Sequence, residues 1–521
     1  MYNHKLADTV VKNVNVLTME PRQPVAKGIA IADGKIIALL TDKQQDVPLS
    51  KSGIIIDGAN RTVMPGLIDA HLHLKGVLSQ YVSLSCDATN VTSIADIIQL
   101  IHKKAMTLPP NQWIRAMNYD TFYLREQRHP TRWDLDQAST KHPIRLRHVT
   151  RHVSVLNSLA LNMAGISKHS SEPANVTVDR DPITNEPTGI IYGGDAWLSS
   201  TVIPPLSQTE IKQSISKLQT DLLKYGIVAV YDASPTNDVS DVFLWTKIIN
   251  DDWPITVQLM TNIENYHSIK QQLNEQPTVI KDGRLSLGHV KVVIESANGL
   301  NPNLDQLTEI AITCCKHHIP LAIHVVEPEM IAVAIEAIKQ AEKQTNVQLS
   351  HRFEHLSLCP DTFLKDIQRL QIDVVTNPSL IYDHGNRYVQ DVEKVFHKWL
   401  YRMRTVKNHG ITLAAGSDAP VATINPWKSM YTATSRKTRK GQYINKNEAL
   451  TRQQMIQLFT TNAAKVSNWA HIRGKIAVGY NADFIVLNHN PLTCSLNQLK
   501  TLTAQQTWID GKIVYEKNKL I

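Results

Sequence analysis

Two histidines near the start of the chain, His71 and His73, are the first side chains whose types and spacing could do chemistry together. They end the apolar, strand-like run MPGLIDAHLH, and residues two apart on a strand point to the same side. Two imidazoles on one side of a strand can share a metal ion. With 21 histidines in 521 residues, about one H-x-H pair is also expected by chance. The pair alone therefore fits two structural histidines equally well.

Three further residues of metal-ligand type stand where strands are expected to end. His324 lies in LAIHVV, His355 ends HRFEH, and Asp418 follows AAGS. The ends of different strands of a closed α/β barrel converge on one pocket. Imidazole nitrogens and a carboxylate suit zinc or a similar divalent cation, with a coordination position left open for water. Each residue alone is explained by a structural role, but their common position predicts a centre of one or two cations.

Lys291 is the unusual residue of another predicted strand, GHVKVVI. Alternation along this strand turns Val290 and Val292 towards the covering helices and Lys291 towards the interior, on the same side as Glu295. A buried ammonium without a partner is costly. Two interpretations stay open, an ion pair with Glu295 and a neutral amine that adds CO₂ to form a carbamate between two cations.

The middle of the chain alternates predicted strands with amphipathic stretches of helical length, such as 208–225, 303–318, 328–344 and 388–408. Strand–helix alternation predicts parallel strands, and eight such units close a (β/α)₈ barrel. An open doubly wound sheet is the alternative, but no glycine-rich phosphate loop follows the first strand. The eight candidate strands are 62–70, 227–232, 255–262, 288–294, 319–325, 349–356, 371–377 and 411–417.

The two ends of the chain read differently from the middle. Short β-branched runs at 10–17, 28–32, 35–40, 483–487 and 507–515, with Asp-Gly turns between some of them, predict strands and hairpins. We therefore expect a small β-sandwich domain made of residues 1–63 and 474–521, and a barrel over 64–473. The stretch 75–225 is too long for a loop and predicts an insertion after the first barrel strand. There it would cover the pocket and shape substrate choice.

Composition excludes several classes of protein. The net charge of +8 is spread along the chain without a basic cluster, which argues against nucleic-acid binding. The five cysteines are scattered, and the sequence predicts neither a secretory leader nor a run of apolar residues long enough to cross a membrane. We expect a cytoplasmic protein with a small-molecule substrate and no membrane partner, and a homodimer stays open.

Together these motifs resemble the amidohydrolase superfamily, and most closely its family 3 branch, which includes N-substituted formamide deformylases. The resemblance rests on PGLIDAHLH, the lone strand lysine, the two later strand-end histidines and GSDAP. It extends to LRHVTRHVSVLNSLAL, PTGII, NPSLIYDHGNRY, NPWKSMYTATSR and IRGKIAVGYNADFIVL, and so covers nearly the whole chain.

The resemblance implies a role for each ligand-type residue. His71 and His73 would hold a first metal with Asp418, a carboxylated Lys291 would bridge to a second metal, and the second would be held by His324 and His355. The chain departs from the family where it reads Glu295-Ser-Ala-Asn-Gly and His324-Val-Val-Glu-Pro. Both departures flank expected ligands, so substrate scope and metal number stay open.

The expected reaction is hydrolysis of a non-peptide C–N bond, of the amide, N-acyl or formamide kind. A divalent cation lowers the pKa of its water from about 15.7 towards 7, and Asp418 would act as general base and then as general acid. His152 is a candidate donor to the substrate carbonyl or an anchor of the insertion, whereas structural roles are favoured for Tyr382 and Arg387. The alternatives are a deaminase or a lactonase on the same barrel and a non-catalytic relative.

Overall fold

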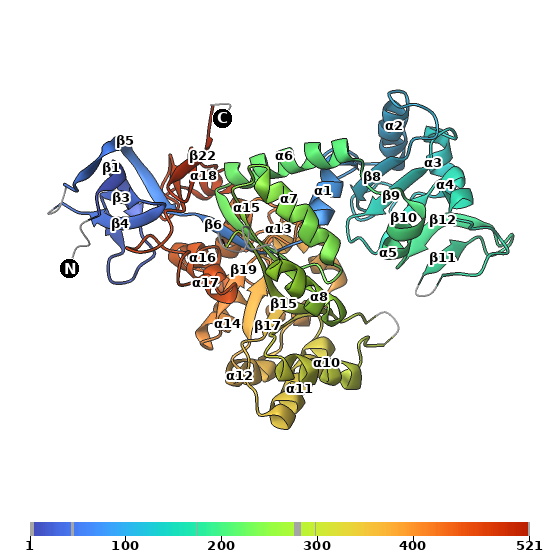
Figure 1. Ribbon diagram of the computed structural model, residues 1–521. Coiled ribbons are helices and arrows are strands. Elements are labelled where there is room, and N and C mark those ends of the chain that lie inside the picture. The colour runs from blue at the N-terminus through green and yellow to red at the C-terminus, as the bar shows by residue number, and fades with distance from the viewer. Residues whose placement is uncertain (1–4, 43–45, 174–175, 276–282, 297–298, 519–521) are drawn as a thin grey trace. The chain divides into compact units, whose positions relative to one another are not determined.

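The computed structural model of the chain describes residues 5–42, 46–173, 176–275, 283–296 and 299–518 (Figure 1). The chain divides into two compact units, residues 1–74 with 219–521, and residues 75–218. Each unit has its own sheets and its own buried core, so each is described by itself.

The larger unit contains a sheet of eight strands, all paired in parallel, as the sequence predicts for a barrel. Most of these strands are short and buried on both faces, which explains their continuous apolar runs. In sheet order they are β6 (Leu67–Leu72), β13 (Ile227–Asp232), β14 (Thr256–Thr261), β15 (Leu285–Val293), β16 (Leu321–Val325), β17 (Arg352–His355), β18 (Asp373–Thr376) and β19 (Leu413–Ala415).

The first and last strands of this sheet approach each other and nearly close the barrel. The Asp418 amide donates to the His71 carbonyl at 2.8 Å. The Ser417 amide donates to the Asp69 carboxylate at 2.9 Å. Gly416 permits this approach, because a Cβ there would lie 2.4 Å from the backbone nitrogen of His71. The sequence therefore folds into the predicted barrel, with its seam directly beside the expected metal ligands.

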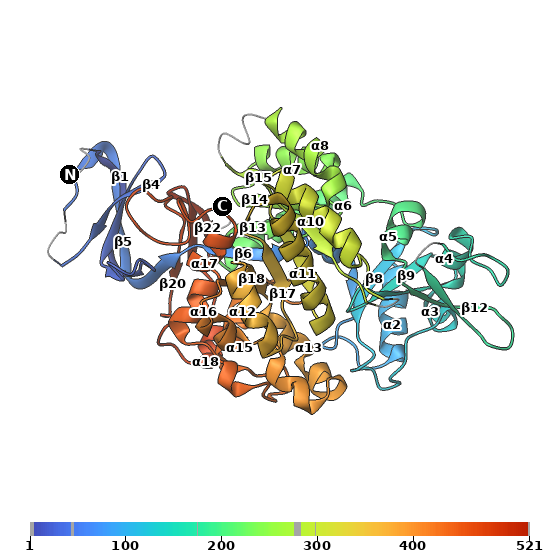
Figure 2. The same ribbon diagram turned by 90° about the horizontal axis from the view of Figure 1, so that it is seen from below.

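Helices surround the barrel strands in both views (Figures 1 and 2). The predicted helices at 303–318 and 328–344 are confirmed as α10 (Leu304–Lys316) and α11 (Pro328–Thr345). The other helices associated with this unit are α6 (Gln208–Lys224), which runs on from the smaller unit, α7 (Val239–Asn250), α8 (Ile263–Asn274), α12 (Asp361–Arg369), α13 (Pro378–Asp391), η2 (Lys394–Trp399), α14 (Met403–Asn408), α15 (Pro426–Ser435), η3 (Lys446–Glu448), α16 (Arg452–Leu458), α17 (Thr461–Val466) and α18 (Leu496–Lys500).

Two predictions were wrong, because a strand and a helix that were each expected to be continuous are divided in the structure. The expected strand 62–70 is divided at Gly66 into β5 (Leu49–Pro65) and β6, because its halves pair with different sheets. Met64 pairs with Ile485 in the terminal sheet. The expected helix 388–408 is also divided, because the chain becomes extended after α13 and Leu400 forms a bridge with Leu358.

Both ends of the chain contribute to one mixed sheet, in the order β22-β21-β20-β5-β1-β3-β4 with β2 beside β1. The Asp33-Gly34 and Asp510-Gly511 hairpins have positive φ at both residues, as a type I′ turn requires. That this sheet forms a separate β-sandwich domain stays a prediction. Its remaining strands are β1 (Ala7–Leu17), β2 (Val25–Ala26), β3 (Gly28–Ala32), β4 (Lys35–Leu40), β20 (Phe484–Leu487), β21 (Gln506–Ile509) and β22 (Lys512–Glu516).

The smaller unit has a six-stranded sheet, in the order β11-β12-β10-β9-β8-β7, and its own apolar core around Ile97, Leu135 and Leu146. That it covers the pocket stays a prediction. No helix in the described part of the chain has both the length and the hydropathy needed to cross a membrane. The elements of this unit are α1 (Leu74–Val82), β7 (Leu84–Ser85), α2 (Ile94–Ala105), β8 (Ile114–Tyr119), α3 (Arg132–Ala138), β9 (Ile144–His148), β10 (Val153–Leu156), α4 (Ser158–Met163), β11 (Thr177–Arg180), β12 (Pro187–Tyr192), α5 (Asp195–Trp197) and η1 (Leu198–Val202).

His351, a buried histidine just before β17, makes the free energy of unfolding depend on pH. The His351 Nδ1 atom accepts from the Leu321 amide at 3.0 Å, and burial lowers the pKa of His351 from 6.5 to about 4. His351 therefore binds a proton more readily in the unfolded chain than in the folded one. The contribution of neutral His351 to stability is complete above pH 6.5 and is lost as pH falls towards 4. In His351→Asn an amide oxygen can accept the same hydrogen bond without titrating. As pH falls from 6.5 to 4, we expect the free energy of unfolding to decrease less steeply in this variant than in the wild-type protein. The two slopes should differ by up to about 1.4 kcal/mol per pH unit.

Denaturant titrations at several pH values measure the two slopes. Equal slopes for the wild-type protein and the variant would contradict the assignment of a neutral, buried His351.

Candidate metal centre

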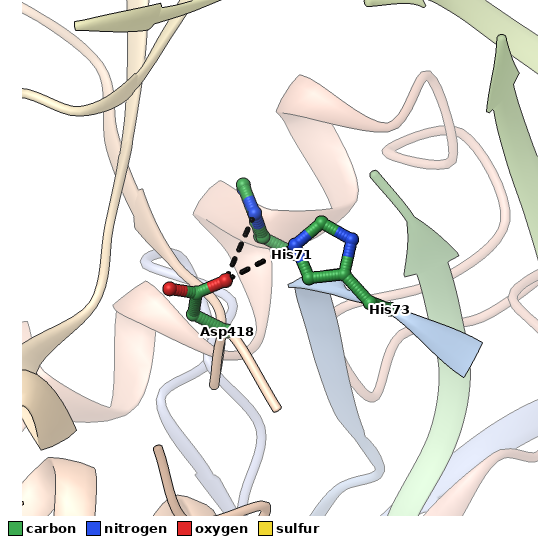
Figure 3. Close-up of side chains that lie close together, drawn as sticks. All are labelled: His71, His73 and Asp418. Carbon is green, nitrogen blue, oxygen red and sulfur yellow. Dashed lines mark ion pairs between the residues drawn. The ribbon is translucent and has the colours of Figure 1, made fainter. Parts of the chain in front are cut away.

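His71, His73 and Asp418 bring potential ligand atoms together at the seam of the barrel (Figure 3). His71 lies in β6, His73 just beyond its end, and Asp418 three residues beyond β19. One carboxylate oxygen of Asp418 lies 3.4 Å from Nε2 of His71 and 3.2 Å from Nε2 of His73. One ligand atom from each residue falls within 4.8 Å of the others. A single divalent cation fits the chemistry of this donor set.

The hydrogen bonds and charges around His71 show whether its Nε2 atom could bind a cation. Its Nδ1 atom contacts the Glu354 carboxylate, which only accepts hydrogen bonds when ionised, so Nδ1 carries the proton. In the neutral ring, Nε2 then presents a lone pair to the Asp418 oxygen, and this buried Nε2 makes no hydrogen bond. Burial opposes a charge, but the Glu354 and Asp418 carboxylates raise the pKa of His71. A cation between these atoms would replace the extra proton that the carboxylates favour.

His73 and Asp418 are likewise oriented and charged in a way that suits metal binding. Nδ1 of His73 lies 3.1 Å from the Ser234 hydroxyl, which leaves Nε2 directed at Asp418. Burial disfavours the ionised form of Asp418, but the two imidazoles hold the pKa of this carboxyl well below its usual range. Asp418 is therefore a carboxylate at neutral pH, which is the form that binds a metal.

His355 and His324 continue the group away from the seam. The ring of His355 lies 4.9 Å from that of His71 and 4.6 Å from that of His324, between centroids. Nδ1 of His355 faces the Asn377 side-chain oxygen at 2.7 Å. The Asn377 amide group donates to the Gly416 carbonyl at 3.1 Å, which fixes its orientation. The Asn377 contact occupies Nδ1, so Nε2 is the atom of His355 that would bind a cation.

The charge states of these two histidines also suit metal binding. Burial lowers the pKa of His355 to about 3. Burial, with His355 beside it, lowers the pKa of His324 well below its usual value. Both imidazoles are neutral at physiological pH, and neutral imidazole is the form that coordinates a metal.

Lys291 is buried in the barrel with 2 % of its surface exposed. Its charge interacts with Glu354 and Asp418, and burial lowers its pKa to about 8. Glu295, the partner considered from the sequence, is exposed, and its backbone bridges to Asn301 instead. Within the described residues Lys291 makes no ion pair with it. Part of the departure from the family pattern after this strand, residues 297–298, lies outside the described residues.

Positive φ angles direct two of these side chains into the centre. His355 has φ 69° and Asp418 has φ 58°, in the left-handed region that non-glycine residues rarely adopt. Such residues cost about 1–3 kcal/mol and persist only where the surroundings hold them. The positive φ of His355 ends the alternation of side-chain directions along β17. Glu354 and His355 can therefore both face the metal ligands although they are adjacent in the chain.

The remaining candidates from the sequence are placed elsewhere. His152 is exposed in the smaller unit, just before β10, and its role at the site stays a prediction. Tyr382 is buried on α13, against the Tyr431 ring and the Lys500 ammonium, which fits the structural role expected for it. Arg387, also on α13, is partly exposed.

Sequence reasoning missed the residues that hold the ligands. Glu354, Ser234 and Asn377 each contact the Nδ1 atom of a predicted ligand. A signal was present for one of them, because HRFEH places Arg352 and Glu354 on the same side of a buried strand, where unpaired charges are costly. Ser234 and Asn377 lie just beyond strand ends and carry no comparable pattern.

The comparisons with known proteins agree with this geometry. Residues 55–515 match the model of the amidohydrolase family. The chain belongs to this family. The amidohydrolase is 26 % identical to an N-substituted formamide deformylase from Arthrobacter pascens, over 98 % of this chain and 99 % of the relative.

Solved structures show the same fold. A metal-dependent hydrolase from Pyrococcus horikoshii OT3 superposes with a TM-score of 0.72 at 20 % identity, covering 94 % of the amidohydrolase and 99 % of that chain. A zinc-bound adenosine deaminase from Xanthomonas campestris has a TM-score of 0.57 at 12 % identity, covering 99 % and 95 %. Family and relatives together make the protein a hydrolase that acts on C–N bonds.

The three-residue group predicts that a divalent cation stabilises the fold. With zinc at one hundred times its dissociation constant, we expect the free energy of unfolding to rise by about 2.7 kcal/mol. His73→Ala removes one of three ligands, so the gain at the same zinc concentration should shrink. The exposed pair His267 and His317, whose rings lie 4.9 Å apart, could bind zinc at the surface, so His267→Ala is the control. Denaturant titrations with zinc and with chelator measure the gain. A gain lost in His267→Ala and kept in His73→Ala would contradict the assignment.

Proposed function

We propose that this amidohydrolase hydrolyses a non-peptide C–N bond of the amide, N-acyl or formamide type in a small molecule. The convergence of His71, His73 and Asp418 at the barrel seam is the observation that carries the proposal. Support for the substrate class comes from the deformylase of Arthrobacter pascens, which is similar over nearly its entire length.

The ligand atoms described above would hold the cation, zinc in the first place. A bound divalent cation polarises a carbonyl and lowers the pKa of water towards 7. We assign to Asp418 the role of accepting the proton of the attacking water, because its carboxylate is ionised and lies 3.2 Å from Nε2 of His73. The same carboxyl would then return the proton to the leaving nitrogen, which departs poorly unless it is protonated.

A second cation position would be formed by His324 and His355, with Lys291 as the bridging ligand. For this role the amine must lose its proton and add CO₂, which forms an N–C bond, releases one proton and leaves a carbamate. The pKa of Lys291, lowered from 10.5 to about 8, makes the reactive neutral amine more abundant than in an ordinary lysine. His152, from the smaller unit, is proposed to donate to the substrate carbonyl.

Replacing Asp418 by Asn tests the proton-transfer role. The amide keeps an oxygen that can bind a cation but cannot accept a proton, so we expect the turnover of an N-alkylformamide to fall by about 10²–10⁴-fold. Zinc content and the thermal unfolding profile should stay close to wild type. Analysis of the wild-type products separates the proposed reaction, which gives formate and an amine, from a deaminase, which gives ammonia. Retained turnover in Asp418→Asn would remove this residue from the mechanism.

Replacing Lys291 by Met tests the carbamate separately. After equilibration with ¹³C-bicarbonate, the wild-type protein should show a carbamate signal by ¹³C NMR that the variant lacks. Lys475, which pairs with Glu20 at 2.6 Å far along the chain from the ligands, offers a control, and Lys475→Met should keep the signal. A signal of equal size in Lys291→Met would show that the lysine is not the modified group.

A further inference from the structure

The two imidazoles of the H-x-H pair are held by chemically different partners. His71 is fully buried, and its Nδ1 atom meets the carboxylate of Glu354. The His73 side chain is 29 % exposed, and its Nδ1 atom meets the neutral Ser234 hydroxyl at 3.1 Å. A histidine that donates to a carboxylate is a more basic and more firmly oriented ligand than one that donates to a hydroxyl. The two neighbouring ligands are therefore not equivalent.

The carboxylate behind His71 is itself held from the opposite side. Nε of Arg352 donates to the second oxygen of Glu354, and both side chains are fully buried. Another nitrogen of Arg352 donates to the Ala70 carbonyl at 2.8 Å, next to His71 in the chain. The guanidinium lies 4.6 Å from the centre of the Tyr231 ring. Arg352 thus connects β17 to the strand that carries His71.

The charges of this pair explain how a carboxylate can be kept inside the barrel. Burial alone would raise the pKa of Glu354, but Arg352, His71 and Lys291 hold it well below its usual range. A buried ion pair contributes little net stability compared with apolar residues of similar size. Its presence here is better explained by what the Glu354 carboxylate does to His71.

We propose that Arg352 and Glu354 are positioning residues that make His71 the anchoring ligand of the cation, while His73 is the weaker ligand. This inference rests on the proposed metal-dependent function. Arg352 fixes the carboxylate and Glu354 fixes the proton on Nδ1, so that the Nε2 lone pair of His71 points to the cation position before any metal arrives.

Matched variants test this asymmetry by metal affinity, without any need for a substrate. Glu354→Gln keeps an oxygen that can accept from His71 but removes the charge, and we expect zinc affinity to fall by about 10–100-fold. Ser234→Ala removes the corresponding partner of His73 and should cost clearly less than Glu354→Gln. Competition of the purified apo-protein with a coloured chelator gives the zinc dissociation constants. The visible spectrum of bound cobalt should change in Glu354→Gln and remain close to wild type in Ser234→Ala.

A double variant shows whether a loss of zinc affinity in Glu354→Gln comes from misfolding. Glu354→Gln alone leaves the Arg352 charge buried without its partner, whereas Arg352→Met with Glu354→Gln removes both charges. Because Arg352 acts through Glu354, the double variant should show the same zinc affinity as Glu354→Gln and unfold cooperatively. Wild-type affinity in the double variant, or an equal loss in Ser234→Ala and Glu354→Gln, would overturn the inference alone. A wild-type protein that binds no zinc would overturn both the inference and the proposed function.

Discussion

The hydrogen bond from the Asp418 amide to the His71 carbonyl joins the two ends of the barrel sheet, and the metal centre depends on it. The same contact that nearly closes the barrel brings together side chains almost 350 residues apart in the chain, as the Ser417–Asp69 hydrogen bond shows by its separation of 348. Gly416 is required by this contact, because any side chain would collide with His71. Closure of the fold and assembly of the site are therefore one event.

The electrostatics of the barrel interior prepare the ligands for a cation. Desolvation keeps His324 and His355 neutral, while Arg352 keeps Glu354 ionised and the imidazoles of His71 and His73 keep Asp418 ionised. Burial alone would have neutralised the carboxylates as well. Mutual interactions inside the group decide the outcome, and they give each residue the charge state that metal binding needs.

The sequence predicts the barrel well because alternation and apolar runs are local properties of the chain. The bounds of β13 were obtained to the residue, and the ligand candidates follow from positions at strand ends. The division at Gly66 could not be seen, because it depends on β20, more than 400 residues later, which pairs with β5. The division of the helix predicted at 388–408 similarly depends on the bridge between Leu358 and Leu400. The Asn377 and Ser234 contacts depend on three-dimensional neighbours and leave no periodic signal.

The pairing of β5 with β20 has a consequence for how the chain is made. During synthesis from the N-terminus, β6 and its histidine emerge early, but their neighbours on one side are β19 and, through β5, the strand β20 near the C-terminus. Until those segments leave the ribosome, the early strands keep an uncovered edge, which is prone to wrong pairing. The nascent polypeptide thus cannot complete its ligand group before Asp418, the last of the three ligands in a chain of 521 residues, has been translated.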